Sequence, residues 1–325
     1  MIITQTPLRI SFAGGGTDFK GFYSSEYGAV VSMAIDKYVY VIVKERFDDL
    51  IRVGYTRTEM VENVTEIQHE LVREAMRMVG VTKGLEVSTM ADIPSEGSGL
   101  GSSSTVTVGL LNALHAYKGE TINAEILARE ACEIEINVLG KPIGKQDQYI
   151  AAYGGLRYFR FHGNEEVEVE SIAIDDGAKQ RLCESLLLFY TGVTRKSADV
   201  LQEQKGNIVN KMVILTDMRN QADELARHLK VGAIASLGQT LREGWLKKKQ
   251  LASGITNSQI DKYYDLAMSG GAIGGKVTGA GGGGFFLVCT PPENRAAVRK
   301  KLSELRELPI NMSRDGSKVI FNVRR

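Results

Sequence analysis

Residues 94–106 contain three glycines within five positions, Gly97, Gly99 and Gly101, followed by three serines that begin an apolar, helix-forming run. Glycine lets the backbone approach a ligand closely and adopt positive φ, and the first turn of a helix presents unpaired N–H groups at the positive end of its dipole. The segment therefore predicts a phosphate-binding loop, although a glycine turn capped by serine is the alternative. Because no Lys follows Gly101, it is not a Walker A loop.

A second glycine-rich segment, residues 274–284, runs directly into the apolar residues 285–289. A flexible linker would have polar neighbours on both sides, so this composition argues against a linker. By itself the segment is equally typical of a tight turn that enters a buried strand. Together with the first glycine-rich segment, it indicates a backbone surface that packs against phosphates or against the first loop.

The N-terminal segment predicts a strand that ends at a polar site. Residues 8–12 alternate apolar and polar side chains, which is typical of a half-buried strand, and residues 14–18 are three glycines followed by Thr17 and Asp18. Polar groups at a strand end over a glycine turn commonly line binding sites. The alternative is that Asp18 caps a helix that begins near Phe19.

One glutamate is out of place on a predicted amphipathic helix. The apolar residues of segment 123–139 recur at helical spacing, at Leu127, Ala131, Ile134 and Val138. Glu135 falls on that apolar arc, whereas Glu130 lies at its edge and Glu133 points away. A carboxylate that faces a core is costly unless it is paired or bound to a cation, so Glu135 is a candidate ligand. A helix stop and a turn follow, and the turn offers Asp147.

The chain has 325 residues and 43% hydrophobic content, which suggests two domains with large cores. We expect an α+β organisation with a boundary after residue 178, where the composition shifts. The expected strands are 2–12, 29–34, 37–46, 50–54, 85–90, 156–161, 167–172, 186–190, 285–289 and 319–323, with the last completing the second domain. The expected helices are 63–79, 103–117, 123–139, 207–229, 233–250, 257–268 and 293–305.

Composition excludes several classes of protein. The net charge is +1 with mixed signs, which favours small local partners and argues against nucleic acid or membrane binding. The three cysteines lack metal-ligand spacing and the four histidines are scattered, so we expect no zinc site. No signal peptide or apolar run of membrane-spanning length is visible, which predicts a cytoplasmic protein. The sequence is compatible with a homodimer.

The segments 9–18, 94–104 and 276–284, in this order, resemble the three motifs of the GHMP kinases, the family of galactokinase, homoserine kinase, mevalonate kinase and phosphomevalonate kinase. The resemblance covers nearly the whole chain. Within the family, residues 14–18 and 190–198 look most like the D-glycero-D-manno-heptose 7-phosphate kinases, and fucokinase domains share part of the pattern. The resemblance implies a ribosomal protein S5 domain 2-like ATP-binding domain at 1–178, a ferredoxin-like domain at 179–325, and an active site between them.

The resemblance also implies roles for individual residues. Asp147 matches the candidate base for the acceptor hydroxyl, and Arg9 matches the arginine beside it; Ser103 and Glu135 match the Mg²⁺ ligands. The residues implied in binding the phosphates of ATP are Gly97, Gly99, Leu100, Gly101, Ser102, Ser103 and Ser104. Those implied in binding the acceptor or closing over it are Gly16, Thr17, Asp18, Thr278, Gly279, Ala280, Gly281 and Gly282. Arg195 and Lys196, adjacent cations after a buried strand, are candidates for a phosphate on the acceptor, with ordinary surface charge as the alternative.

The implied activity is transfer of the γ-phosphoryl group of ATP to the anomeric hydroxyl of heptose 7-phosphate, giving the 1,7-bisphosphate. One alternative is a fucokinase-like enzyme that acts on an unphosphorylated sugar. Two others are an ATP-dependent decarboxylase of the same fold and a non-catalytic sensor of sugar and ATP. The sugar-type motif at residues 14–18 argues against the decarboxylase, and the full set of Arg9, Ser103, Glu135 and Asp147 argues against a sensor.

Overall fold

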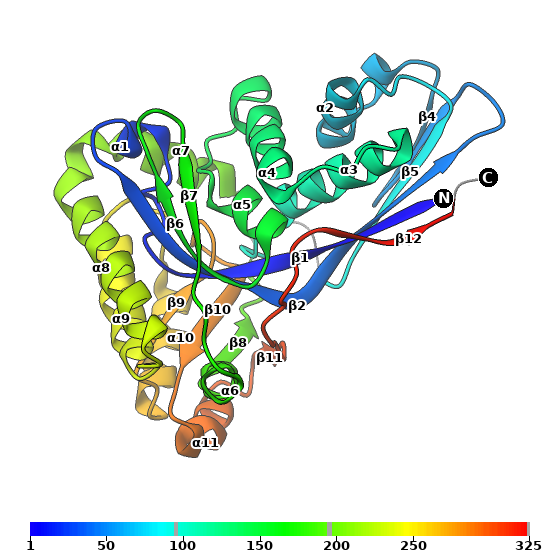
Figure 1. The fold of residues 1–325 in the computed structure, drawn as a ribbon. Helices are drawn as coiled ribbons and strands as arrows, with labels where there is room; N and C mark the ends of the chain where they lie inside the picture. The colour runs from blue at the N-terminus through cyan, green and yellow to red at the C-terminus, as the bar shows by residue number, and fades with distance from the viewer. Residues whose placement is uncertain (94–96, 194–196, 324–325) are drawn as a thin grey trace.

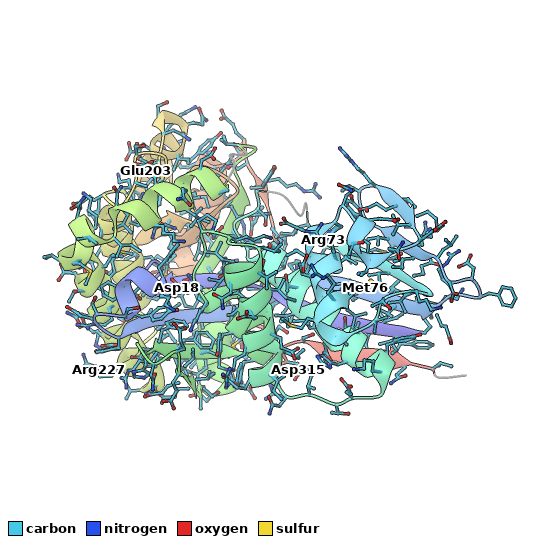
Figure 2. All side chains as sticks on the ribbon, turned by 90° about the horizontal axis from the view of Figure 1, so that it is seen from above. Asp18, Arg73, Met76, Glu203, Arg227 and Asp315 are labelled. Atoms are coloured by element: carbon cyan, nitrogen blue, oxygen red, sulfur yellow. The ribbon has the colours of Figure 1, made fainter. Side chains whose placement is uncertain are left out.

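Two long strands organise the molecule, β1 (Ile2–Ala13) and β2 (Gly28–Glu45), which pair along almost their whole length. The computed structural model describes residues 1–93, 97–193 and 197–323. β1 is buried over most of its length because helices from both halves of the chain pack against it. In Figure 1 these strands cross the molecule in blue, and Figure 2 shows Asp18 in the half that carries the yellow-green helices, with Arg73 and Met76 in the other half.

The larger sheet has eight strands, with the order β12-β1-β2-β5-β3-β4 and the hairpin β6-β7 attached to β2. The further strands are β3 (Ile51–Gly54), β4 (Thr58–Val61), β5 (Leu85–Ala91), β6 (Leu156–Phe161), β7 (Val167–Ser171) and β12 (Lys318–Asn322). All pairings are antiparallel except that of β3 with β5. β2 therefore holds the sheet together, since β5 pairs with one end of it and β6 with the other.

The helical elements in the first half of the chain are α1 (Lys20–Tyr23), η1 (Val64–Glu66), α2 (Glu70–Val79), α3 (Ser102–Lys118), α4 (Ala124–Cys132), the π-helix η2 (Glu133–Val138), α5 (Gln146–Tyr153) and α6 (Asp176–Glu184). Helices α2, α3, α4 and α5 lie over one face of the larger sheet, whereas α6 lies away from them, at the smaller sheet (Figure 1). The central helix is α3, which packs on β1 and β2 and is flanked by α2, α4 and α5. Its buried face contains Val108, Leu111 and Leu114, which pack into the main hydrophobic core.

The second half of the chain builds a four-stranded sheet with the order β11-β8-β10-β9. Its strands are β8 (Leu186–Tyr190), β9 (Gly274–Val277), β10 (Phe285–Cys289) and β11 (Arg306–Glu307). Its helices are α7 (Ser197–Asn207), η3 (Val209–Lys211), α8 (Met212–Lys230), α9 (Ser236–Lys248), α10 (Ser258–Ser269), η4 (Pro292–Asn294) and α11 (Arg295–Lys301). A second core forms around Trp245 and Phe286. No helix of the described ranges has the length and apolar character needed to cross a bilayer.

The structure corrects several expectations about the elements. The strand expected at 319–323 forms, but it pairs with β1 and so joins the larger sheet instead of the second domain. The strands expected at 29–34 and 37–46 are one continuous strand, the helix expected at 63–79 is divided into η1 and α2, and the one expected at 207–229 begins only at 212 as α8. The boundary after residue 178 stays a prediction.

The segment 123–139 is helical but not regular throughout. α4 ends at Cys132, and η2 follows with π-helical bonding, in which the Leu139 N–H donates to the Ile134 carbonyl at 2.9 Å. A π-turn contains more residues than an α-turn, which rotates the side chains that follow it. The expectation that Val138 faces inward is therefore wrong, because Val138 is exposed, while Glu135 is fully buried as expected.

Candidate active site

The first glycine loop meets the N-terminus of α3. Gly101 is the N-cap, with φ +79°, and α3 begins at Ser102, one residue earlier than the helix expected at 103–117. The loop is closed by its own side chains, because the hydroxyls of Ser98 and Ser102 lie 2.9 Å apart. Ser104 is buried inside the first turn, whereas Ser103 is exposed. The free N–H groups of this turn form a surface suited to the phosphates of a nucleotide.

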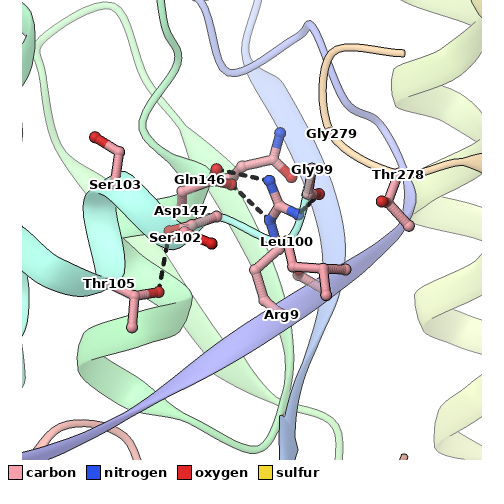
Figure 3. Close-up of polar contacts among 12 residues, drawn as sticks. Arg9, Gly99, Leu100, Ser102, Ser103, Thr105, Gln146, Asp147, Thr278 and Gly279 are labelled. Carbon is pink, nitrogen blue, oxygen red and sulfur yellow. Dashed lines mark hydrogen bonds and ion pairs between the residues drawn. The ribbon is translucent and has the colours of Figure 1, made fainter. Parts of the chain in front are cut away.

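The second glycine loop packs directly against the first. A Cβ at Gly99, whose φ is +72°, would lie 2.6 Å from the Thr278 carbonyl oxygen, so only glycine fits there. The Phe285 N–H donates to the Ser98 carbonyl at 3.2 Å, and Figure 3 shows Thr278 and Gly279 beside Gly99. Of the two interpretations left open by the sequence, the structure bears out contact between the loops.

Arg9, which is buried, forms an ion pair with the half-buried Asp147 below this loop (Figure 3). Arg9 Nε donates to Asp147 Oδ1 at 2.7 Å and Nη2 donates to Oδ2 at 2.6 Å, while Nη1 donates to the Gly99 carbonyl at 2.6 Å. The guanidinium thus orients the carboxylate and ties it to the phosphate loop at once. Asp147 was expected in a turn; it lies instead in the first turn of α5, which holds it more rigidly.

Asp18 does not cap α1, whose N-cap is Phe19 without a side-chain cap. The buried Asp18 carboxylate accepts the Gly16 N–H at 2.9 Å and the Gln146 N–H, at the start of α5, at 3.2 Å. Burial raises the pKa of the Asp18 carboxyl above its ordinary value, and the nearby Asp147 adds to the rise, although the N–H donors oppose it. Asp147 lies in the first turn of α5, and Asp18 accepts a hydrogen bond from the first N–H of that helix. Both carboxylates therefore lie at the N-terminus of α5.

Glu135 lies beside the first turn of α3. Its Oε1 accepts from the Ser103 hydroxyl at 2.5 Å and its Oε2 accepts from Gln148 Nε2 at 2.8 Å, while Lys141 Nζ is 3.7 Å from Oε1. Burial raises the pKa of the Glu135 carboxyl, and the Lys141 ammonium is the largest opposing influence. A fully buried carboxylate held next to a hydroxyl at a nucleotide loop is a costly arrangement in the free protein.

This pair fits a magnesium ion. A carboxylate and a hydroxyl are hard oxygen donors, which Mg²⁺ prefers, and Mg²⁺ is usually held by one or two protein groups together with substrate phosphates and water. Two protein ligands agree with the observation that no group of three or more His, Cys, Asp or Glu within the described ranges is arranged for a metal. When bound, the ion would neutralise charge on the phosphates of ATP, and Ser103 and Glu135 would hold it.

A pocket lies between Arg9 and Asp147 on one side and α9 and β9 on the other. Gly16 and Asp18 line it, as do Gly279 and Ala280, whereas Thr17, Thr278, Gly281 and Gly282 are not among its lining residues. The Thr17 hydroxyl is used inside its turn, where it donates to the carbonyls of Gly14 and Ala29.

The rest of the second glycine loop is used in packing. Thr278 donates to the Phe285 carbonyl, and Gly281 and Gly282 pack against Ile255. The expectation that Thr17, Thr278, Gly281 and Gly282 contact the acceptor stays a prediction. Arg195 and Lys196 lie outside the described residues.

The pocket also contains two lysines to which the sequence analysis assigned no role, although Lys276 begins the motif segment 276–284. Lys248, at the end of α9, is 6% exposed, and Lys276, in β9, is 7% exposed. Burial lowers the pKa of the Lys248 ammonium to about 8 and lowers that of Lys276 well below its ordinary value. A helical-phase argument would have found Lys248, because it follows Leu241 and Trp245 on the buried side of α9.

Comparison with known proteins identifies the family. Residues 50–155 match the model of the GHMP kinase N-terminal domain and residues 222–307 match that of the GHMP kinase C-terminal domain. A D-glycero-alpha-D-manno-heptose 7-phosphate kinase of Campylobacter jejuni is 29% identical over 93% of both chains. An L-fucokinase/L-fucose-1-P guanylyltransferase of Bacteroides fragilis is 26% identical over 92% of this chain and 36% of its own length.

The fold agrees with this result. A crystal structure of a D-glycero-D-manno-heptose 1-phosphate kinase from Bacteroides thetaiotaomicron superposes over 100% of both chains with a TM-score of 0.83 at 24% identity. The chain belongs to the GHMP kinase family, and the α+β architecture expected from its sequence is confirmed. It is accordingly an ATP-dependent phosphotransferase with an alcohol group as acceptor.

Proposed function

We propose that this chain is a sugar 1-kinase that transfers the γ-phosphoryl group of ATP to the anomeric hydroxyl of D-glycero-D-manno-heptose 7-phosphate, with the 1,7-bisphosphate as product. The similarity over 93% of a heptose 7-phosphate kinase supports the choice of acceptor. The observation that carries the proposal is the Arg9–Asp147 pair, which lies between the phosphate loop and a pocket lined by Asp18. That position is where an acceptor hydroxyl and a γ-phosphoryl group must meet.

Asp147 accepts the proton of the acceptor hydroxyl as the new O–P bond forms and the bond to the β-phosphate oxygen breaks. Arg9 orients this carboxylate through two hydrogen bonds and offsets negative charge on the phosphoryl group in transit. General-base help is typically worth about 10²–10⁴-fold, and positioning and charge neutralisation supply most of the remaining acceleration, since the transition state is loose.

The backbone N–H groups from Gly99 to Ser103 bind the β- and γ-phosphates of ATP in this proposal. Ser103 and Glu135 hold Mg²⁺ beside them, which explains why a carboxylate is fully buried at this point. Gly16 and Asp18 contact sugar hydroxyls, and Gly279 and Ala280 close the opposite side of the pocket. Arg195 and Lys196 remain candidates for further contacts to the acceptor phosphate.

An ADP-release assay with purified protein and a panel of sugars and sugar phosphates tests the proposal. We expect heptose 7-phosphate to give the highest kcat/KM, and we expect Mg²⁺ to be required. Preference for fucose or another unphosphorylated sugar would establish the fucokinase-like alternative. The similarity to the fucokinase of Bacteroides fragilis is the reason to test that alternative. Binding of sugar and ATP without any ADP release would identify a sensor and would refute the kinase assignment of the pocket.

A further inference from the structure

Lys248 and Lys276 place two ammonium groups inside the acceptor pocket without a carboxylate partner. Lys248 Nζ donates to the Gly279 carbonyl, and Lys276 Nζ donates to the Ser11 carbonyl at 2.9 Å. Within the described ranges, neither ammonium makes an ion pair with an acidic side chain. An ammonium has three N–H donors, so each lysine keeps donors that the folded chain leaves unused.

Another buried lysine of this chain has a partner for its charge within the protein. Lys145 is 8% exposed, and its ammonium pairs with the Glu165 carboxylate and lies over the ring of Tyr23. Burying a charge is costly unless it is paired, and Lys145 meets that requirement within the protein. Lys248 and Lys276 do not, which indicates that their counter-charge comes from a ligand.

The charges that line the pocket leave room for that ligand. The pocket is lined by three basic groups, Arg9, Lys248 and Lys276, and by two acidic ones, Asp18 and Asp147, so the basic groups outnumber the acidic ones by one. The Asp147 charge is already engaged by Arg9 through two hydrogen bonds. The two lysines therefore have only the Asp18 carboxylate nearby to balance them, and it is itself used by two backbone N–H groups.

The same pocket contains polar atoms that lack a hydrogen-bond partner. The Ser11 hydroxyl and the Gln146 side-chain oxygen are both buried and unpartnered, and both residues line the pocket. Buried polar groups are nearly always hydrogen-bonded in native structures, so these atoms point to a ligand that carries hydroxyl groups. A ligand with both hydroxyl groups and negative charge satisfies the whole set.

We propose that Lys248 and Lys276 form the subsite for a phosphate monoester carried by the acceptor itself. This inference rests on the proposed function and deepens it, because it explains how the pocket selects a phosphorylated sugar over a neutral one. Charged hydrogen bonds from two lysines would bind such a group, and the buried position would exclude water from it.

The position of Lys276 separates its end of this subsite from the phosphoryl group in transit. The Arg9 backbone N–H donates to the Leu100 carbonyl of the phosphate loop, whereas Lys276 contacts Ser11, two residues further along β1 toward the glycine turn at 14–16. Two residues of extended strand span about 7 Å. A phosphate bound by Lys276 thus lies on the acceptor side of the reacting atoms, and Lys248, which contacts Gly279 of the second glycine loop, lies between it and the phosphate loop.

The first experiment compares Lys248→Met and Lys276→Met with the matched control Lys247→Met. Lys247 is the adjacent residue on α9, and its ammonium faces Asp217 at 3.6 Å instead of the pocket. With heptose 7-phosphate we expect KM to rise roughly 10- to 100-fold in both pocket variants, as one charged hydrogen-bonding group is removed. The KM for ATP should stay unchanged, the preference in kcat/KM for the phosphorylated over the unphosphorylated sugar should fall, and Lys247→Met should match the wild type in every constant.

Stability measurements give an independent readout. Because each pocket ammonium is buried without a carboxylate, its replacement by Met should leave the ligand-free protein equally or more resistant to urea. A structural role predicts the opposite, a loss of stability with unchanged KM for the sugar phosphate. An equal loss of kcat for phosphorylated and unphosphorylated sugars would assign the lysines to the phosphoryl group in transit. Either result would overturn the subsite.

A binding test does not depend on the identity of the sugar. With Mg²⁺ and a non-hydrolysable ATP analogue filling the nucleotide site, inorganic phosphate should bind the wild type, as measured by calorimetry, and should bind Lys248→Met and Lys276→Met at least about 10-fold more weakly. Equal phosphate binding by all variants would refute the subsite even in an active heptose kinase. Wild-type preference for a neutral sugar would refute the proposed function alone.

Discussion

Asp147→Asn removes the negative charge opposite Arg9 while it keeps the size of the side chain. Asp147 accepts two hydrogen bonds from the guanidinium, at 2.7 and 2.6 Å, and an amide offers only one oxygen for them. Losing one charge-assisted hydrogen bond costs about 1.5–3 kcal/mol. Because the Asp147 side chain is 23% exposed, water replaces part of the loss, and we expect a decrease in unfolding free energy near 1.5 kcal/mol.

The effect on catalysis should be larger. The amide cannot accept a proton, so kcat should fall about 10²–10⁴-fold, which corresponds to roughly 3–5 kcal/mol in the barrier. Affinity for ATP should change little, because the nucleotide phosphates bind at the glycine loop and not at Asp147. Steady-state ADP release at saturating ATP and sugar gives kcat, and urea unfolding of the same samples gives the stability.

Asp48→Asn is the matched control for this substitution. Arg46 holds Asp48 in the same two-bond arrangement, with Nε to Oδ1 and Nη2 to Oδ2 both at 2.7 Å, at an exposed position outside the pocket. We expect normal kcat and little change in stability, as for exposed ion pairs. Near-normal kcat with a raised sugar KM in Asp147→Asn would show that Asp147 anchors the substrate and is not the base.

Three further predictions follow from the site. Glu135→Gln should reduce activity more than about 100-fold at ordinary Mg²⁺ concentrations, because loss of a direct ligand costs more than loss of an outer-shell group. If the dependence of kcat/KM on Mg²⁺ concentration matched that of the wild type, Glu135 would be a structural acid. Gly99→Ala should raise the KM for ATP, measured in the same assay, because its Cβ would meet the Thr278 carbonyl at 2.6 Å. Burial lowers the pKa of Lys248 to about 8 in the folded protein, so above pH 8 the unfolded chain binds more protons at this residue than the folded protein does. The free energy of unfolding of the ligand-free wild type, measured in urea relative to Lys248→Met, should therefore rise from pH 8 toward pH 10.

The sequence predicted the parts of the site that depend on local pattern. The first glycine loop, the strand that carries Arg9 and the burial of Glu135 all follow from residue type and period. The second glycine loop was interpreted only in part, because its glycines are required by contacts with Gly99, Ile255 and Val193, which lie far away in the chain. Thr17 shows the same limit, since its sequence position does not reveal that its hydroxyl completes a turn, and its contact with the acceptor stays a prediction.

Of the two pocket lysines, one could have been identified from the sequence pattern and the other only from the tertiary structure. Lys248 belongs to the run 247–249, which is typical of a solvated surface, yet it lies three residues after the buried Trp245 and seven after the buried Leu241. The rule that identified Glu135, a charged residue in the phase of an apolar helix face, therefore applies to Lys248 as well. Lys276 has no such signal, because β9 is only four residues long and buried throughout. Its role depends on the pairing that brings β9 to Ser11, and only a charge without a protein partner in the folded structure reveals it.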